Sequence, residues 1–276
     1  MQYLAMLERI EGAPQYHFLW NELPIEERIP AAARYGFDGV DFWDWYDKDI
    51  DTLARIAADN GVFINSVFAY RKGSLCNSDD HQLVLDQFKE SLEMAERCGV
   101  KALFLQTDEV GEGGNVIPPA RPHTRAERWA ELEEGIARVI ELVDNSGVDV
   151  DLLVEPLSQA DVHGYLLRTS QEGYDLIAKF DAPRVKLVFD LYHEQINAGN
   201  LIQSLRNTFN RVGAIHISNV PGRGAPGTGE IDIAAIWREM QALGYDGPVG
   251  FETVPGTAST EETLAKVKEI FPWPAA

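Results

Sequence analysis

The sequence predicts an α/β fold, a single (β/α)8 TIM barrel that occupies residues 1–276 as one domain. Three observations support this prediction. Short apolar runs alternate with segments of helical periodicity roughly once every 30 residues, which is the spacing of βα units. The length of 276 residues and the apolar content of 45% suit one closed barrel with a large core. Charged residues end several of the apolar runs, where the active site of a barrel lies.

Eight short segments are predicted to be strands, because each is an apolar run bounded by turn-forming or polar residues. They are Tyr3–Leu7, Gly39–Phe42, Phe63–Phe68, Ala102–Leu105, Asp151–Glu155, Lys186–Phe189, Ala214–Ile217 and Val249–Phe251. Eight longer segments show the periodicity of amphipathic helices. They are Pro24–Tyr35, Ile50–Asn60, His81–Cys98, Thr124–Ser146, Ser170–Phe180, Leu201–Asn210, Ile233–Leu243 and Thr260–Ile270.

Glycines follow several of the predicted helices, where a residue free to adopt positive φ can close the last turn. They are Gly36, Gly61, Gly99, Gly147 and Gly244. An open, doubly wound sheet is the alternative fold. It is disfavoured because no GxGxxG turn follows the first predicted strand.

Four polar side chains stand at the ends of the last four predicted strands, in LLVEP, LVFDLYH, AIHIS and VGFET. They are Glu155, Asp190, His216 and Glu252. Because the carboxyl ends of barrel strands meet at one mouth, these side chains are expected to converge. Three carboxylates and one imidazole suit Mn²⁺, Mg²⁺ or Co²⁺ better than a structural zinc. Each residue alone could instead cap a helix or pair with an arginine, but four on consecutive strands favour a metal site.

Two further polar residues are candidates for binding a substrate. Arg223, in the glycine-rich segment GRGAPGTGE, could form a two-pronged pair with a carboxylate or phosphate, or it could clamp an acid such as Glu230. His193 lies three residues after Asp190, where we expect a loop, and its ring could reach a ligand hydroxyl. Aromatic residues after the first two strands could wall the pocket or pack in the core: Phe18, Trp20, Trp43 and Trp45.

Several stretches resemble the xylose-isomerase-like barrel superfamily, and in particular its hydroxypyruvate isomerase branch. They are PIEERIPAAARYGFDGVDFWDWYD, VEPLSQADVHGYLL, FDLYHEQ, HISNVPGRGAPGTGEID and GFET, and the likeness spans most of the chain. The resemblance implies that Glu155, Asp190, His216 and Glu252 bind the metal, that Glu155 and Glu252 also move the substrate proton, and that His193 and Arg223 hold the substrate.

This resemblance implies an intramolecular isomerase that converts hydroxypyruvate to tartronate semialdehyde. A divalent cation would acidify the C–H bond between a carbonyl and a hydroxyl and stabilise the resulting enediolate. One glutamate would take the proton and the other would return one. Return to the adjacent carbon gives isomerisation, and return to the opposite face of the same carbon gives epimerisation. A ketose 3-epimerase and another sugar or keto-inositol isomerase therefore remain as alternatives.

Two differences from these families bear on which substrate the protein binds. Ketose 3-epimerases of the superfamily follow their first metal glutamate with a pattern like EVLNRFE, whereas this chain has EPLSQAD, so the later acid is Asp161. The pocket of hydroxypyruvate isomerases varies where this chain has Trp43, Trp45, Tyr70 and Arg71. The residues expected to contact the substrate are Asp161, Trp43, Tyr70 and Arg71, and the identity of the substrate stays open.

The formal net charge of −20 disfavours nucleic acid as a partner, because binding to a phosphate backbone needs a positive surface. A DNA-repair endonuclease of the same superfamily is the first rival, but INSVFAYRK and LFLQTDE lack the histidines of a multi-metal cluster. A glycosidase could use two strand-end carboxylates, although His216 and Asp190 favour a metal. A non-catalytic barrel that binds a sugar or a metal is the remaining rival.

The amino-terminal stretch MQYLAMLERIEG has no long apolar run, so neither a signal peptide nor a membrane span is expected. We therefore predict a cytoplasmic protein with a small-molecule substrate and no membrane partner; a homo-oligomer is left open. The negative charge could reflect a salt-rich environment or simply an acidic surface. A melting temperature that does not rise in molar salt would exclude the first explanation.

Overall fold

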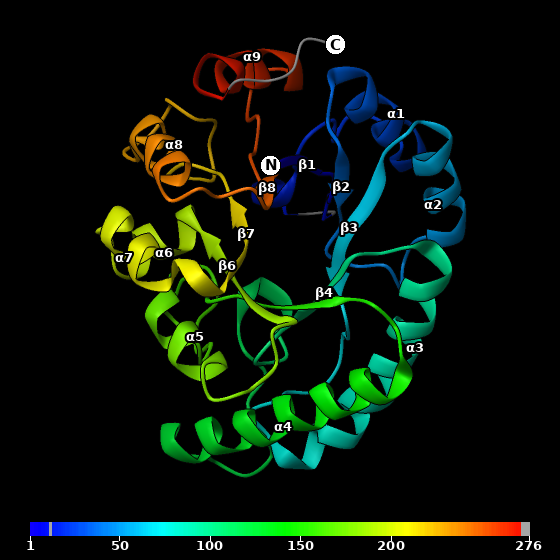
Figure 1. Cartoon of the computed structure of the whole chain (residues 1–276), viewed down its shortest axis with the longest axis vertical. Coiled ribbons are helices and arrows are strands. Elements are labelled where there is room, and N and C mark those ends of the chain that lie inside the picture. The colour runs from blue at the N-terminus through cyan, green and yellow to red at the C-terminus, as the bar shows by residue number, and fades with distance from the viewer. Residues whose placement is uncertain (11–12, 272–276) are drawn as a thin grey trace.

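The computed structural model describes residues 1–10 and 13–271. Within them, eight parallel strands pair in chain order and close into a barrel, which confirms the predicted fold. Figure 1 shows the helices arranged around the strands. The strands are β1 (Gln2–Met6), β2 (Gly39–Asp41), β3 (Phe63–Phe68), β4 (Ala102–Leu105), β5 (Asp151–Val154), β6 (Val185–Asp190), β7 (Val212–His216) and β8 (Pro248–Phe251).

The predicted helices are present with nearly the predicted bounds. The α-helices are α1 (Ile25–Tyr35), α2 (Ile50–Asp59), α3 (His81–Cys98), α4 (Arg125–Ser146), α5 (Ser170–Ile177), α6 (Leu191–Asn197), α7 (Leu201–Thr208), α8 (Ile233–Ala242) and α9 (Thr260–Ile270). Short 3-10 helices are η1 (Pro14–Tyr16), η2 (Ser78–Asp80), η3 (Glu112–Gly114) and η4 (Phe209–Arg211).

Helix α6 was not predicted, and the expectation of a loop around His193 was wrong. The helix begins directly after β6, and Asp190 caps it by accepting a hydrogen bond of 2.9 Å from the backbone N–H of His193. A helix of two turns is too short to show a periodic pattern and depends on such caps and on burial. Its first residues, from Leu191 to Glu194, are buried.

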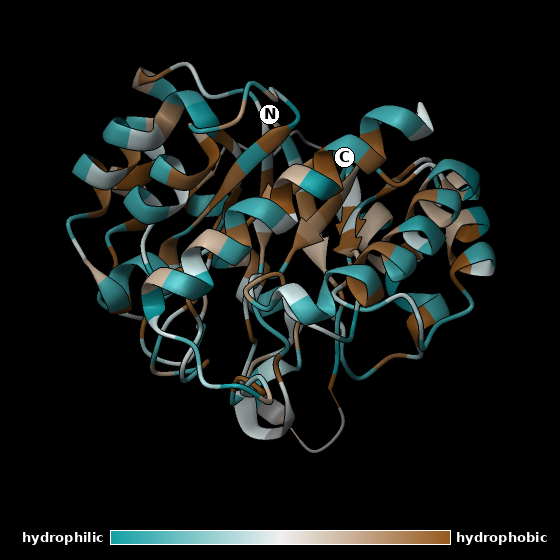
Figure 2. Ribbon diagram, turned by 90° about the horizontal axis from the view of Figure 1, so that it is seen from below, coloured by the Kyte–Doolittle hydropathy of each residue, from teal (hydrophilic) through white to brown (hydrophobic). Residues whose placement is uncertain are grey.

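The main hydrophobic core lies between the strands and the surrounding helices. In Figure 2 the strands are mostly brown, and the helices carry brown on one side and teal on the other. A smaller apolar cluster is formed by Ala102, Phe104, Leu153, Val188 and Ala214. These residues alternate with core-facing ones along β4 to β7, so they fill the barrel interior.

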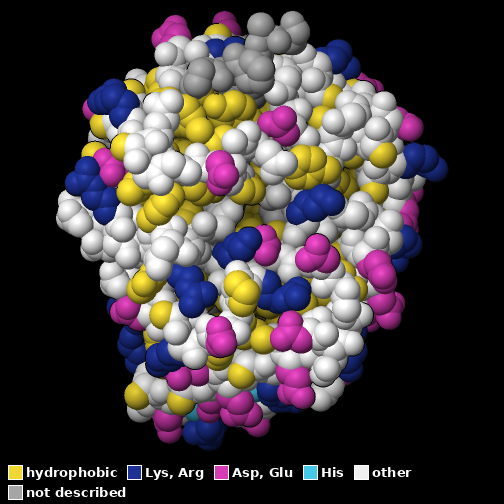
Figure 3. Space-filling model, in the orientation of Figure 1, with side chains coloured by type: hydrophobic (Ala, Val, Ile, Leu, Met, Phe, Trp, Pro, Cys, Tyr) yellow, Lys and Arg dark blue, Asp and Glu magenta, His cyan; other side chains and the backbone are white. Residues whose placement is uncertain are grey.

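The surface carries both signs of charge despite the net negative total. Figure 3 shows acidic and basic side chains interspersed over the face that it presents. Some are paired, as Arg206 is with Glu239 at 2.7 Å. In the described part of the chain, no helix combines the length and the apolar character needed to cross a membrane.

Candidate metal centre and active site

The structure brings the four strand-end residues together. Glu155 and Glu252 directly follow β5 and β8, and Asp190 and His216 end β6 and β7. Because the strands pair in order with Asp190 opposite His216, the four side chains meet at the carboxyl ends of the strands. His216 Nδ1 lies 3.5 Å from Glu155 Oε1, 3.9 Å from Asp190 Oδ2 and 3.4 Å from Glu252 Oε1.

Three atoms of this cluster are buried and lack a hydrogen-bond partner among the described residues. They are Glu155 Oε1, Asp190 Oδ2 and His216 Nδ1. Buried polar atoms are normally paired, so three that converge without donors indicate a site for an external cation. Ligand atoms of Asp190, His216 and Glu252 all lie within 4.8 Å of one another. The residues could therefore hold a divalent cation with three oxygens and one nitrogen.

The pKa values show a cluster that holds excess negative charge. Burial raises the pKa of Glu155 to about 7; His216 opposes the rise, and Glu252 and Asp190 add to it. Burial also raises the pKa of Asp190. Burial opposes the charge on His216, but the carboxylates of Glu252, Glu155 and Asp190 outweigh it and raise the pKa of the imidazole to about 10. A bound divalent cation would favour the charged form of these buried carboxylates and so oppose the rise in their pKa.

Glu252 is held from two further sides. Trp43 Nε1 donates a hydrogen bond of 3.3 Å to its Oε1, and Arg223 donates one of 2.7 Å from Nη1 to its Oε2. Both carboxylate oxygens therefore have donors, and the side chain has one defined orientation. Glu155 differs from Glu252, because its Oε1 is without a donor among the described residues.

Arg223 lies inside the site, with 5% of its surface exposed. Besides Glu252 it faces Asp190 Oδ2 at 3.7 Å, and its guanidinium lies 4.6 Å from the centre of the Tyr192 ring. Its backbone φ of +54° is unusual for a residue other than glycine, and such conformations cluster at functional sites. Arg223 does pair with an acid, but that acid is Glu252 and not Glu230, which was the suggested partner.

His193 contacts a hydrogen-bond donor at each ring nitrogen. Its Nδ1 accepts a hydrogen bond of 3.0 Å from the backbone N–H of Ser158, and its Nε2 contacts Nη2 of Arg223. Burial, Arg223 and His216 lower the pKa of His193 well below its usual value, so the ring is neutral. A neutral imidazole has one acceptor nitrogen, so it cannot satisfy both donors.

The other predicted substrate-binding residues divide into two groups. Trp43 contacts Glu252, and Asp161 accepts hydrogen bonds from Ser158 Oγ and, at 3.3 Å, from the hydroxyl of Tyr192. These contacts connect Trp43 and Asp161 with the site.

Tyr70 and Arg71 have their contacts elsewhere. Tyr70 is buried and its hydroxyl donates to the carbonyl of Gln106. Arg71 pairs with Asp44 and Asp47, and its side chain is 42% exposed. The structure does not bring either residue into contact with the four strand-end residues.

An aromatic wall surrounds the indole of Trp43. Phe68 stacks on it at 6.0 Å, while Tyr16 and Phe18 meet it edge-on at 5.1 and 5.3 Å. Trp20 and Trp45, which were also considered for the pocket, instead donate to Glu261 and Ser91. The sequence reasoning missed Tyr16, Phe68 and Tyr192. Tyr192 could have been noticed because it precedes His193 directly in FDLYHEQ.

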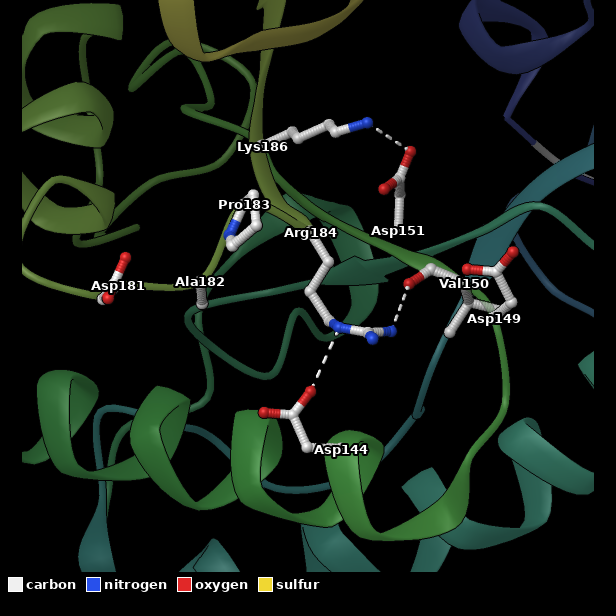
Figure 4. Close-up of a pocket in the computed structure, with 9 residues that line it drawn as sticks. All are labelled: Asp144, Asp149, Val150, Asp151, Asp181, Ala182, Pro183, Arg184 and Lys186. Carbon is white, nitrogen blue, oxygen red and sulfur yellow. Dashed lines mark hydrogen bonds and ion pairs between the residues drawn. The ribbon is translucent and has the colours of Figure 1, made fainter.

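A surface cavity of about 370 Å³ lies at the opposite ends of the strands. Figure 4 shows that it is lined by the start of β5, the segment before β6 and one residue of α4. Its cationic side chains are already paired, Arg184 with Asp144 at 3.2 Å and Lys186 with Asp151 at 2.7 Å. Glu155 and Asp190 stand at the other ends of these strands, so this cavity is separate from the candidate site.

Comparison with known proteins shows the family of this chain. Hydroxypyruvate isomerase of Escherichia coli strain K12 is 25% identical over 248 residues, 87% of this chain and 92% of that protein. 2-Oxo-tetronate isomerase of Cupriavidus necator is 29% identical over 262 residues, which cover 93% of this chain and 96% of that protein. The crystal structure of AP endonuclease, family 2 from Brucella melitensis matches with a TM-score of 0.83 and 25% identity, covering 97% of this chain and 98% of that one. The family described as xylose isomerase-like TIM barrel matches residues 29–270, and the chain belongs to it.

Proposed function

We propose that this protein is a divalent-metal-dependent isomerase that moves a proton between adjacent carbons of a small hydroxy-carbonyl substrate through an enediolate. Conversion of hydroxypyruvate to tartronate semialdehyde is the leading candidate reaction. The similarity to hydroxypyruvate isomerase and to 2-oxo-tetronate isomerase extends over nearly the whole chain, and it supports this reaction class.

One observation carries the proposal. Glu155 Oε1, Asp190 Oδ2 and His216 Nδ1 are buried, close together and without donors in the described chain. A purely structural cluster would be expected to satisfy these atoms internally, because each unpaired buried polar group costs about 1–3 kcal/mol. A bound Mn²⁺, Mg²⁺ or Co²⁺ would polarise the substrate carbonyl and stabilise negative charge on its oxygen.

The two glutamates have different surroundings, which suits two roles in proton transfer. Burial and neighbouring carboxylates raise the pKa of Glu155 to about 7, and a proton-transfer group works best with a pKa near the operating pH. Glu252 is oriented by Trp43 and Arg223. We propose that one glutamate takes the proton from the substrate carbon and that the other returns a proton.

His193 and Arg223 are proposed to hold the substrate. In the structure two donors meet at His193, and an oxygen atom of a ligand between its Nε2–H and the Arg223 guanidinium would accept from both. A carboxylate fits such a pair of donors well, because guanidinium groups bind carboxylates in two-pronged geometry. Such a pair of donors favours a keto acid such as hydroxypyruvate over a neutral sugar.

A ketose 3-epimerase is the second candidate, because the same glutamates could return the proton to the opposite face of one carbon. Asp161 bears on this alternative. Its carboxylate is occupied by Ser158 and Tyr192 in the structure, at the edge of the site. A role for Asp161 in binding substrate hydroxyls would require it to leave one of these partners.

Endonuclease activity is disfavoured for this chain, although one similar structure is described as an AP endonuclease. The net charge of −20 opposes binding to DNA. Among the four strand-end residues, His216 is the single histidine. A multi-metal centre would be expected to use several histidines.

The experiment is proton exchange in D₂O. The metal-loaded protein is incubated with hydroxypyruvate and with a panel of tetroses, pentoses and hexoses, and carbon-bound deuterium and new products are followed by NMR. Glu252→Gln removes one proton-transfer group with little change of shape. Glu239→Gln, which alters an exposed ion pair with Arg206, is the matched control.

Deuterium next to a carbonyl that is lost in Glu252→Gln and after chelation, but kept in Glu239→Gln, would support enediolate chemistry. The product then separates isomerase from epimerase. Absence of exchange with every substrate and metal would contradict the proposal and favour a barrel that only binds a sugar or a metal.

A further inference from the structure

A buried carboxylate near the metal-site cluster has no part in the proposed reaction. Asp41 ends β2, and 1% of its surface is exposed. Burial raises the pKa of Asp41, and the nearby charge of His216 opposes that rise. A carboxylate inside a barrel is costly unless it has partners, so its contacts should indicate why it is there.

One oxygen of Asp41 is fixed by an irregularity of the sheet. The register of β2 on β3 shifts between Val40 and Asp41. The shift lets two consecutive residues of β3 reach the same atom: Asn65 Nδ2 donates to Asp41 Oδ1 at 2.9 Å, and Ser66 Oγ donates to it as well. Bulges of this kind re-aim side chains next to active sites. The orientation of the carboxylate is thereby set.

The other oxygen of Asp41 lies beside Gly250, as does the ring of His216. Asp41 Oδ2 has no hydrogen-bond partner among the described residues. A Cβ atom on Gly250 would lie 3.5 Å from this oxygen, 3.3 Å from His216 Nε2 and 2.9 Å from His216 Cδ2. Glycine is therefore needed at 250 for the imidazole to lie where it does, and it leaves Nε2 and Oδ2 bordering one shared space.

The two nitrogens of His216 have separate environments. Nδ1 faces the carboxylates of the cluster, the nearest being Glu252 Oε1 at 3.4 Å. An imidazole that binds a cation through Nδ1 carries its proton on Nε2. Metal-binding histidines almost always donate this second N–H to a carboxylate, a carbonyl or water, which fixes the tautomer and the ring orientation.

We propose that Asp41 is a positioning residue for His216. With the cation bound, its Oδ2 would accept the proton of His216 Nε2, which would keep Nδ1 unprotonated and aimed at the cation. Gly250 keeps open the space in which the two groups meet. This inference rests on the metal centre of the proposed function, and Asp41 acts through the imidazole without touching the substrate.

The first test measures Mn²⁺ binding by the electron paramagnetic resonance signal of the free ion, for the wild type, Asp41→Asn and Asp108→Asn. Asp108 is a matched control because 2% of its surface is exposed and its carboxylate is bound by Arg128 and Thr107. We expect Asp41→Asn to weaken Mn²⁺ binding by about 10–100-fold, the usual effect of removing such a partner. Asp108→Asn should leave the affinity unchanged even if it lowers the melting temperature.

A second readout needs no variant of Asp41. In the Mg²⁺-loaded wild type with ¹⁵N-labelled histidine, NMR should show His216 as the Nε2–H tautomer with a downfield, slowly exchanging proton. Unchanged Mn²⁺ affinity in folded Asp41→Asn would overturn the role of Asp41 alone. An Nδ1–H tautomer would overturn that role and also contradict His216 as a metal ligand through Nδ1. Absence of Mn²⁺ binding by the wild type would instead overturn the metal centre, the proposed function and this inference together.

Discussion

Trp43 Nε1 donates a hydrogen bond of 3.3 Å to Glu252 Oε1, although the two residues are 209 positions apart in the chain. The contact joins the segment after β2 to the segment after β8. It also connects the aromatic wall with one of the two glutamates proposed to move the substrate proton. The indole therefore has two separable properties, a flat apolar surface and one N–H donor.

Replacing Trp43 with Phe should separate these properties. The phenyl ring can still stack on Phe68, but the donor to Glu252 is lost. We expect the turnover number to fall about fivefold, which corresponds to one hydrogen bond of about 1 kcal/mol. Steady-state kinetics would measure the change. Trp45→Phe is the control, because the Trp45 indole donates to Ser91 and its loss should lower stability without this effect on turnover.

The pKa shifts predict how the stability of the metal-free protein depends on pH. Glu155 has a folded pKa of about 7, above its ordinary 4.5, so the folded state holds extra protons between these values and stability falls as pH rises through that window. His216 has a folded pKa of about 10, above its ordinary 6.5, so its stabilisation is complete below 6.5 and is lost as pH rises toward 10. Both effects weaken the metal-free fold at higher pH.

Urea unfolding between pH 5 and 8, with and without Mg²⁺, measures this dependence. The Glu155 contribution should be at most about 3 kcal/mol across its window and should disappear in Glu155→Gln. Mg²⁺ should stabilise the protein more at pH 8 than at pH 5, because binding requires deprotonated ligands. Equal stabilisation at both pH values would contradict a cation held by this cluster.

Arg223→Lys and Arg71→Lys make a matched pair, since both keep the charge and remove the guanidinium. Arg223 lies between Glu252, Asp190 and His193, whereas Arg71 pairs with Asp44 at an exposed position. We expect Arg223→Lys to raise KM for a keto-acid substrate by roughly 10-fold or more, the effect of losing one charge-assisted hydrogen bond. Arg71→Lys should leave KM unchanged, and a similar rise there would place Arg71 in the substrate site.

Tyr70→Phe tests whether Tyr70 acts in the fold or on the substrate. The hydroxyl of this buried residue donates to the carbonyl of Gln106. Its removal takes a donor from the partly buried carbonyl of Gln106, so the free energy of unfolding should fall by about 1 kcal/mol. Denaturant unfolding would show this loss while KM stays unchanged. A changed KM with unchanged stability would favour substrate contact instead.

Some features could be predicted from local pattern. The bounds of β3, β4, α3 and α9 agree with prediction, because periodicity and helix stops are encoded by residues close together in the chain. Short elements could not be predicted so well. Helix α6 escaped notice because its formation depends on the cap by Asp190 and on burial.

The sequence alone determined the barrel and the four strand-end residues, because a strand of a closed barrel must deliver its last side chains to the common mouth. Tertiary structure alone decided which atoms meet there. Trp43 reaches Glu252, and Arg223 pairs with Glu252 and not with Glu230. Asp41 and His216 both border Gly250. All of these arrangements join strands and loops that are distant in the chain. Such contacts depend on barrel closure, strand register and a bulge, which no local pattern of residues reports.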